Sequence, residues 1–397
     1  MPASRLLNVY NRADPVFVRG EGPWLFDDSG RAWLDCVSGI ACNALGHAHP
    51  RLRAALERQA GKLWHISNMF RIEGQERLAA KLTAHTFADR VFFTNSGAEA
   101  VECALKLARR YHYARGEAHR TTIYSLEGAF HGRTYATINA GGNPAYLDGF
   151  GPSLPGYASL ALEDPPAIER ALAAPDTAAL LLEPVQGEGG ARELPGDLLR
   201  WLRCQCSRRG VLLIYDEVQS GMGRTGQLFA HQWYRGCEPD VMAVAKALGG
   251  GFPVGACLAS EAAASGMVPG CHGSTFGGNP LAMAVAETAF EIIADPAFLD
   301  TVQATSGALR EGLQSLSARY PDVIRDVRGK GMLVGVGVHP TNRAFMAAAR
   351  DQRLLLAGGG NNIVRLLPPL NISAREVDEI LRRFDATCAS MALAEAS

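Results

Sequence analysis

A lysine at the end of an apolar run is the first residue of this sequence that could do chemistry. The stretch VMAVAKALGGGFPVGA, residues 241–256, reads as a buried strand that ends near Lys246 and runs into three consecutive glycines. Burial disfavours an ammonium ion and lowers its pKa, which leaves an amine able to act as a nucleophile. A lysine that extends from the strand end into solvent is the alternative. Lys62, Lys81 and Lys106 lie in polar helical segments and are expected to be solvated, and Lys330 lies in a glycine-flanked turn.

An aspartate occupies a similar place after another apolar run. Asp216 ends the most apolar strand candidate, in IYDEVQSGMGRTG. Ligands of parallel sheets bind outside the carboxyl ends of the strands. A carboxylate that is half-buried there needs a cationic or protonated partner. A structural salt bridge would also satisfy it, so Asp216 by itself leaves both interpretations open.

A third group of residues follows a strand in FFTNSGAEAVECALKLA. The backbone N–H groups of Ser96, Gly97 and Ala98 are expected at the N-terminus of an amphipathic helix, which favours a phosphate group. Ser96 also fits a helix N-cap, with Glu99 completing a capping box. Phosphate binding and capping are compatible.

These three features together predict a cofactor. A phosphate cradle, an aspartate and an amine at one sheet edge suit a phosphorylated aldehyde, because the amine forms a Schiff base and the aspartate keeps a ring nitrogen protonated. The chemistry is that of pyridoxal 5′-phosphate. The glycines after Lys246 are expected to let backbone and substrate come close.

The elements that must position these residues alternate along the middle of the chain. Five runs are apolar on both faces, as buried parallel strands are: RVFFTN, TTIYSL, AALLLEP, VLLIYDEV and DVMAVAK. Two segments with helical periodicity lie between them and end in glycine, at 97–116 and 195–210. This alternation predicts an α/β fold with a mainly parallel sheet covered by helices.

The two ends of the chain have a different pattern. Residues 22–39 predict a hairpin around DDSG, and residues 325–338 and 361–373 predict further strands. We therefore expect a large domain at 61–290 and a smaller α+β domain built from residues 1–60 and 291–397.

Composition excludes several classes of function. The formal net charge of −1 gives no electrostatic reason to expect nucleic acid or an anionic membrane as a partner. We find no apolar run near the ~20 residues of a membrane span and no apolar core of a secretory signal. The nine cysteines are scattered, which indicates a reducing cytoplasm. Cys204 and Cys206 are expected to be core or half-buried thiols of a helix, and His47 and His49 to be structural, so no metal site is predicted.

Eight motifs, in this order along the chain, resemble the class III (ω-amino) aminotransferases among the fold-type I pyridoxal-phosphate enzymes. They are NALGHAHP, NSGAEAVECALKLAR, AFHGRT, EPVQGEGG, YDEVQSGMGRTG, AKALGGGFPVGA, GSTFGGNPLA and IVRLLPPLNIS. The resemblance covers nearly the whole chain. It implies a large domain with a seven-stranded sheet and a homodimer with shared active sites.

The resemblance also implies roles for residues around the cofactor. Lys246 carries the Schiff base and then moves the proton, while Asp216 pairs with the ring nitrogen. Gln219 lies near the phenolic oxygen, and Val218 and Phe130 enclose the ring. Thr275 reaches the phosphate from the second subunit and helps Gly97 and Ala98 to hold it.

Four residues are implied at the substrate. Arg133 binds a substrate carboxylate bidentately, and Ser274 lies nearby. Glu188 neutralises Arg365 while the amino donor binds and then moves aside, so that the arginine takes the second carboxylate of 2-oxoglutarate. A permanent salt bridge between domains is the alternative for this pair.

The implied reaction moves the δ-amino group of N2-acetyl-L-ornithine to 2-oxoglutarate and gives L-glutamate, in the reverse of the direction of arginine biosynthesis. Relatives that act on free ornithine carry a tyrosine where this chain has Ile40, so an acylated donor is favoured. Succinylornithine, N-succinyl-diaminopimelate and 4-aminobutyrate remain alternative donors. An NAD-binding glycine loop is disfavoured, because the G-x-G-x-x-G spacing and its acidic partner are missing. A non-catalytic descendant has little reason to keep Lys246, Asp216, Arg133 and Thr275 together.

Overall fold

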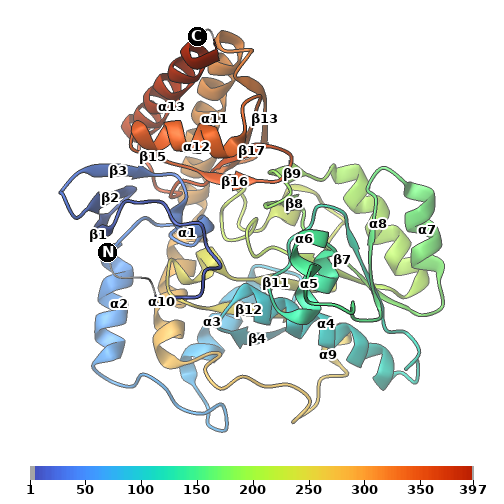
Figure 1. Ribbon diagram of the computed structural model, residues 1–397. Helices are drawn as coiled ribbons and strands as arrows, with labels where there is room; N and C mark the ends of the chain where they lie inside the picture. Colours follow the sequence, from blue (N-terminus) through green and yellow to red (C-terminus); the bar gives the residue numbers. More distant parts are fainter. Residues whose placement is uncertain (1–4, 396–397) are drawn as a thin grey trace.

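The computed structural model describes residues 5–395. Its central element is a seven-stranded sheet, which confirms the predicted mainly parallel α/β architecture (Figure 1). In spatial order its strands are β4 (Arg90–Thr94), β12 (Gly255–Ala259), β11 (Val241–Val244), β10 (Leu212–Asp216), β7 (Thr177–Leu182), β5 (Thr122–Leu126) and β6 (Tyr157–Leu160). β12 runs antiparallel to both of its neighbours, and the other pairings are parallel. All five strands expected from apolar runs are present.

Helices cover this sheet and connect its strands. The predicted helices at 97–116 and 195–210 are α4 (Gly97–Ala114) and α8 (Gly196–Arg209). α4 lays an apolar face against β11 and β12, because its buried residues recur at helical spacing. The other helices of this part are α3 (Glu73–Ala84), α5 (Tyr135–Gly141), α6 (Pro144–Leu147), α7 (Pro165–Ala173), α9 (Glu261–Ala264) and α10 (Pro280–Ile293).

The N-terminal part contains the predicted hairpin. β2 (Trp24–Asp27) pairs with β3 (Ala32–Asp35), and β1 (Phe17–Glu21) adds to β2. Two helices follow, α1 (Ser38–Ala41) and α2 (Pro50–Ala60). The short strand β15 (Leu354–Leu355) pairs with β3, so residues from both ends of the chain share one sheet.

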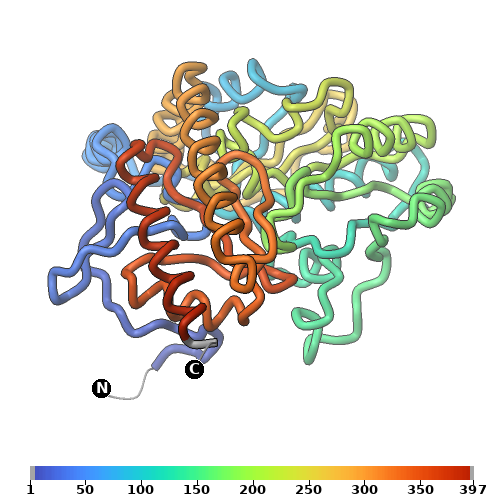
Figure 2. The backbone as a smooth tube through the Cα atoms, turned by 90° about the horizontal axis from the view of Figure 1, so that it is seen from above, coloured from blue at the N-terminus to red at the C-terminus, as the bar shows by residue number. Residues whose placement is uncertain are grey.

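The C-terminal part forms a second four-stranded sheet with three helices beside it. In Figure 2 this part, in orange and red, lies next to the blue N-terminal part. Its sheet order is β13 (Ile324–Lys330), β14 (Leu333–Val338), β17 (Ile363–Leu366) and β16 (Ala357–Gly359). Its helices are α11 (Pro296–Arg319), α12 (Asn342–Asp351) and α13 (Ala374–Glu395). The domain boundaries near residues 60 and 290 stay a prediction. Residues 1–4 and 396–397, which belong to the predicted smaller domain, lie outside the described residues.

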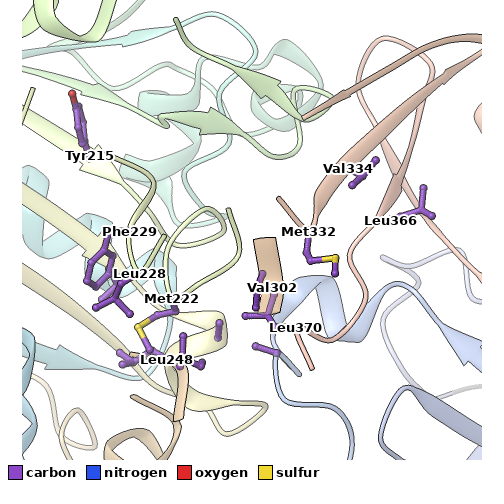
Figure 3. Packing of buried hydrophobic residues seen from close by; sticks show 14 of the residues in the cluster. Tyr215, Met222, Leu228, Phe229, Leu248, Val302, Met332, Val334, Leu366 and Leu370 are labelled. Atoms are coloured by element: carbon purple, nitrogen blue, oxygen red, sulfur yellow. The ribbon is translucent and has the colours of Figure 1, made fainter. Parts of the chain in front are cut away.

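One apolar core joins the central sheet to the C-terminal part. Figure 3 shows Met222 and Leu228, from the loop after β10, near Val302 of α11 and Met332 before β14. These side chains belong to a single buried cluster. Among residues 5–395 no helix is long and apolar enough to cross a membrane.

Three expectations about single residues were wrong. Cys204 is exposed, although its helix neighbour Cys206 is buried as expected. Lys81 is not simply solvated, because it pairs with Glu287 of α10 at 2.9 Å. Lys330 is the last residue of strand β13 and does not lie in a turn, and it pairs with Glu193 at 2.6 Å. In each case the sequence shows only whether the neighbouring residues are polar. The ion-pair partner of a lysine and the exposure of a cysteine depend on segments that are distant along the chain.

Candidate active site

Lys246 lies at the carboxyl edge of the central sheet in a strained conformation. β11 ends at Val244, and Lys246 opens the 3-10 turn η2 (Lys246–Gly249) with φ +46°. Few residues other than glycine adopt this left-handed region, and such strain is concentrated at functional sites. Burial lowers the pKa of Lys246. The predicted nucleophilic amine therefore has the environment that it requires.

Asp216 ends β10, the strand next to β11, and is buried. In the parallel register Asp216 lies opposite Ala243, three residues before Lys246. Its Oδ1 accepts a hydrogen bond from the backbone N–H of Val218 at 2.9 Å. Its Oδ2 lies 2.9 Å from Nδ1 of His131, which is the partner that a buried carboxylate needs.

Sequence reasoning missed His131 as a site residue, although it lies inside the quoted motif AFHGRT. Its ring is buried, and Nε2 has no hydrogen-bond partner among the described residues. A signal was available, because an uncompensated histidine beside Phe130 in a loop at the carboxyl edge of the sheet is a ready partner for Asp216.

Glu183 is a second residue that the sequence analysis missed. It follows β7 and is buried, with Oε1 accepting from the N–H of Phe130 and Oε2 from that of Gly187, both at 2.9 Å. Burial, with the charge of Asp216 adding to it, raises the pKa of Glu183 to about 7. Its position directly after an apolar run is the same signal that identified Asp216.

The N-terminus of α4 lies beside this group, as the sequence predicted. Ser96 caps the helix, and its side chain accepts from the N–H of Glu99 at 3.2 Å. The expected capping box is wrong in one half, because Glu99 Oε2 accepts from the N–H of Asn95 at 2.6 Å and not from Ser96. The first N–H groups of α4 therefore remain available for an anion.

Two glycines bring the segments of the site into close contact. A Cβ at Gly97 would lie 2.6 Å from Cγ1 of Val218, and a Cβ at Gly132 would lie 2.9 Å from Cβ of Ala98. Only glycine permits these approaches. The cradle at the start of α4, the Val218 loop and the AFHGRT loop are thus held at one place.

Two of the glycines after Lys246 let another segment of the chain come close. A Cβ at Gly250 would lie 2.5 Å from Cδ1 of Leu52, and a Cβ at Gly251 would meet the side chain of Asn43. Their φ angles are +55° and +107°. These two glycines are required by packing against residues 43–52, and the approach of substrate stays a prediction.

The predicted pair Arg365 and Glu188 is in contact. Arg365 Nη2 donates to Glu188 Oε2 at 2.6 Å, and Nη1 donates to Gln219 Oε1 at 3.2 Å. Arg365 Nε also donates to the carbonyl of Gly358 at 2.9 Å. The structure thus brings three residues from β17, the β8–β9 hairpin (Val185–Gln186 and Arg192–Glu193) and the loop after β10 together.

Arg133 belongs to the AFHGRT loop, two residues after His131, and is exposed. Its guanidinium lies 3.7 Å from the ring centroid of Tyr146 and 5.6 Å from that of Phe130. The two rings meet edge to face with centroids 5.9 Å apart. Tyr146 was not predicted, and its contact holds the arginine in place through a cation–π interaction.

Ser274 and Thr275 lie on a loop that folds back toward α4. Ser274 Oγ accepts from Asn95 Nδ2 at 3.3 Å, which places it beside the helix cap. Thr275 is exposed, and within residues 5–395 its side chain makes no hydrogen bond. Its role in the site of a second subunit stays a prediction.

Ile40 occupies an unusual backbone conformation in α1. Its φ is +59°, and 38% of its surface is exposed. A β-branched residue in this region is rare. The next residues pack on the turn that follows Lys246, since Asn43 faces Gly251. Ile40 therefore lies on a strained segment beside the lysine turn.

Of the two histidines that were predicted to be structural, one contacts a carboxylate. His47 Nε2 lies 2.8 Å from Asp35 Oδ2, which ties the loop to β3. Across the described part of the chain, no group of three or more His, Cys, Asp or Glu residues is arranged to hold a metal ion.

Comparison with known proteins identifies the family to which this geometry belongs. The family model "Aminotransferase class-III" matches residues 9–388. The chain belongs to this family. Class III aminotransferases use pyridoxal 5′-phosphate, so this is the cofactor of the chain. The site fits it, because the first N–H groups of α4 have no partner within the helix, and the lack of a side chain at Gly97 lets the Val218 loop lie against this helix start.

Relatives of this class III aminotransferase match over nearly its whole length. It is 60% identical to acetylornithine aminotransferase 2 of Caulobacter vibrioides over 96% of this chain and 95% of that protein. It is 51% identical to acetylornithine aminotransferase of Mesorhizobium japonicum, over 99% and 98% of the two chains.

Solved structures of the family agree in fold. The N-acetylornithine aminotransferase of Stenotrophomonas maltophilia has a TM-score of 0.85 at 38% identity, over 97% of this chain and 98% of that one. The ornithine aminotransferase of Toxoplasma gondii has a TM-score of 0.93 at 30% identity, over 98% and 94%.

Proposed function

We propose that this enzyme transfers the δ-amino group of N2-acetyl-L-ornithine to 2-oxoglutarate, giving N-acetyl-L-glutamate 5-semialdehyde and L-glutamate. The observation that carries the proposal is the contact of buried Arg365 with the more exposed Glu188, in a chain 60% identical to an acetylornithine aminotransferase. N2-acetyl-L-ornithine has one carboxylate and 2-oxoglutarate has two. If the ion pair is closed for the first substrate and open for the second, both can bind in the same site in turn. In arginine biosynthesis the flow is the reverse, from glutamate to the semialdehyde. The nine free thiols support the cytoplasmic location that we propose.

The cofactor-binding residues have distinct tasks in this proposal. When bound, pyridoxal 5′-phosphate supplies an aldehyde for a Schiff base and a ring that accepts electrons. The N–H groups of Ser96, Gly97 and Ala98 bind its phosphate at the start of α4. Asp216 binds the ring nitrogen, and His131 orients that carboxylate through the contact at 2.9 Å.

Three side chains surround the ring in the proposal. Val218 and Phe130 enclose its two faces, and Gln219 lies toward its phenolic oxygen. The backbone supports this arrangement, because Val218 packs on Gly97 and the N–H of Phe130 donates to Glu183. The arrangement excludes water from the reacting atoms.

Lys246 moves the proton. Its Nζ takes the proton from the δ-carbon of the donor, and the reduced pKa that burial causes keeps the amine available as a base. The left-handed conformation of Lys246 fixes the start of the side chain at the strand end. A lysine held in this way needs little reorganisation during transfer.

The substrate-binding residues act at the two ends of the donor. Arg133 binds the α-carboxylate, since a guanidinium matches a carboxylate with two hydrogen bonds, and Ser274 lies close to the same end. Glu188 neutralises Arg365 while the donor is bound and swings away for 2-oxoglutarate. Ile40 offers an apolar surface, which suits an acylated α-nitrogen better than a free ammonium ion.

A second donor has support from one relative. The protein named acetylornithine/succinyldiaminopimelate aminotransferase of Yersinia pestis is 44% identical over 97% of this chain and 96% of that one. We infer that N-succinyl-diaminopimelate is the second candidate donor. Both donors carry an acylated α-nitrogen, so the argument from Ile40 applies to both.

We propose that the enzyme is a homodimer in which Thr275 of each subunit reaches the phosphate of the other. Exposed apolar side chains occur on this loop and on the segment 63–70, and exposed apolar patches mark interaction surfaces: Leu63, Trp64, Met69, Phe70 and Phe276. Asn68 Nδ2 donates to the carbonyls of Ser274 and Gly277 at 3.0 Å, which joins the two segments that carry these side chains. Sedimentation of wild type and Trp64→Glu tests the proposal, and a monomeric wild type contradicts it.

The half-reaction tests the donor. We expect addition of N2-acetyl-L-ornithine, without an oxo acid, to convert the absorption band of the lysine-linked cofactor into that of its aminated form. 2-Oxoglutarate should then restore the first band. No response to this donor, with a response to N-succinyl-diaminopimelate or 4-aminobutyrate, would replace the substrate and keep the enzyme class. A protein that gains no band with added cofactor would contradict the role of Lys246.

A further inference from the structure

A cavity of about 420 Å³ lies apart from the site described above. It is formed where α11, the end of β13, β9 and the segment from Thr225 to Trp233 meet. None of the proposed cofactor or substrate residues lines it. It is therefore a separate feature for which the aminotransferase reaction gives no reason.

One face of α11 forms a wall of the cavity. The residues that line it from this helix are Gln303, Ser306, Gly307 and Arg310, at the spacing of a single helix face. Gly307 is in the helix interior, where glycine is less favourable than alanine. A Cβ at Gly307 would have no atom within 4 Å, and its φ is not positive. Neither packing nor backbone conformation requires this glycine, and its effect is to leave the cavity open.

Arg310 gives the cavity an uncompensated positive charge. Its Nη2 donates to the carbonyl of Gly329 at 2.5 Å, and over residues 5–395 it has no ion pair. The other charged groups of the lining neutralise one another, because Lys330 Nζ lies 2.6 Å from Glu193 Oε1. The remaining guanidinium N–H groups match a carboxylate.

An indole completes the lining. Trp233 is held by its Nε1, which donates to the carbonyl of Thr225 at 3.1 Å. Lys330 Nζ lies 4.7 Å from the ring centroid and covers part of the ring, and the rest of the ring offers an apolar surface.

We propose that this cavity binds a small carboxylate with a flat apolar body. The carboxylate lies on Arg310, and the body fills the space over Gly307 and lies against Trp233. The excess charge of one guanidinium favours a monoanion over a neutral molecule of the same shape.

Binding of 4-fluorobenzoate to the holoenzyme, followed by fluorine NMR, tests the proposal. 4-Fluorobenzamide has the same shape without the charge, and we expect it to bind about tenfold more weakly, because a charge-assisted contact is lost. Gly307→Leu places a side chain where the body of the ligand lies and should abolish binding, and Arg310→Gln should weaken it about tenfold. Ala308→Leu places the same side chain on the exposed face of α11 and should bind as wild type does.

Activity separates this cavity from the active site. Each variant should retain the aminotransferase rate of wild type, which shows that it is folded and holds its cofactor. Binding that is equal in wild type and Gly307→Leu would place the probe in the active site and overturn the proposal. Absence of binding to wild type, or equal binding of the amide, would overturn it as well.

Discussion

Arg365 and Glu188 form an ion pair of 2.6 Å whose two members are unequally buried. The side chain of Arg365 is 3% exposed, whereas that of Glu188 is 39% exposed. Arg365 is also fixed by the carbonyl of Gly358 and by Gln219. The glutamate has solvent to move into and the arginine does not, so the pair is built to open on the side of Glu188.

Glu188→Gln should separate the two half-reactions. The charge of Arg365 then stays uncompensated when the donor binds. Because leaving a buried charge unpaired costs at least ~1.4 kcal/mol, we expect the donor half-reaction to slow about tenfold. The half-reaction with 2-oxoglutarate should be unchanged or faster. Stopped-flow rates of each half-reaction measure both. Glu127→Gln, at an exposed position, is the control, and equal slowing of both halves would indicate a permanent salt bridge.

His131→Ala should weaken cofactor binding and destabilise the apoprotein. It leaves Asp216 Oδ2 buried without its partner, at a cost of roughly 1–3 kcal/mol. His131→Asn keeps a donor near the place of Nδ1 and should retain most of both properties. Urea unfolding of the apoproteins and cofactor titration measure the two effects. If the Asn and Ala variants behave alike, the contact of His131 with Asp216 has no role.

Gly97 and Val218 should show strong energetic coupling. Gly97→Ala places a methyl group where Cγ1 of Val218 would be 2.6 Å away, and such overpacking costs about 1–3 kcal/mol. Val218→Ala removes that methyl group, so the double variant should recover part of the loss. A double-mutant cycle on the free energy of unfolding measures the coupling. Additive losses would show that the helix N-terminus shifts instead.

Glu183 should make the apoprotein less stable as pH rises. Its folded pKa of about 7 lies above the ordinary value of 4.5, so the folded state binds the extra proton between these values. The free energy of unfolding therefore falls as pH increases from about 4.5 to about 7, by at most ~1.4 kcal/mol per pH unit. Glu183→Gln should remove this slope. Thermal unfolding of both apoproteins across this pH range measures it, and parallel curves would contradict the raised pKa.

The strands that carry the site were predictable because both faces of each strand are buried. Buried parallel strands are apolar throughout, so the strands ending at Val244, Asp216 and Thr94 could be recognised without their neighbours. β12 was not recognised, because GACLA follows a glycine-rich loop and its antiparallel pairing depends on β4 and β11. Glu183 carried the same signal as Asp216 and was overlooked.

Sequence by itself determined the family, the cofactor and the positions of Lys246 and Asp216, because residue types that follow buried strands must meet at one sheet edge. Only the tertiary structure decided which residues of the site contact one another. It placed His131 on Asp216, Arg365 on Gln219 and Asn43 against Gly251. Hydrogen bonds and close packing act over a few ångströms between segments distant along the chain. Sequence shows which polar groups need partners, and only the fold selects them.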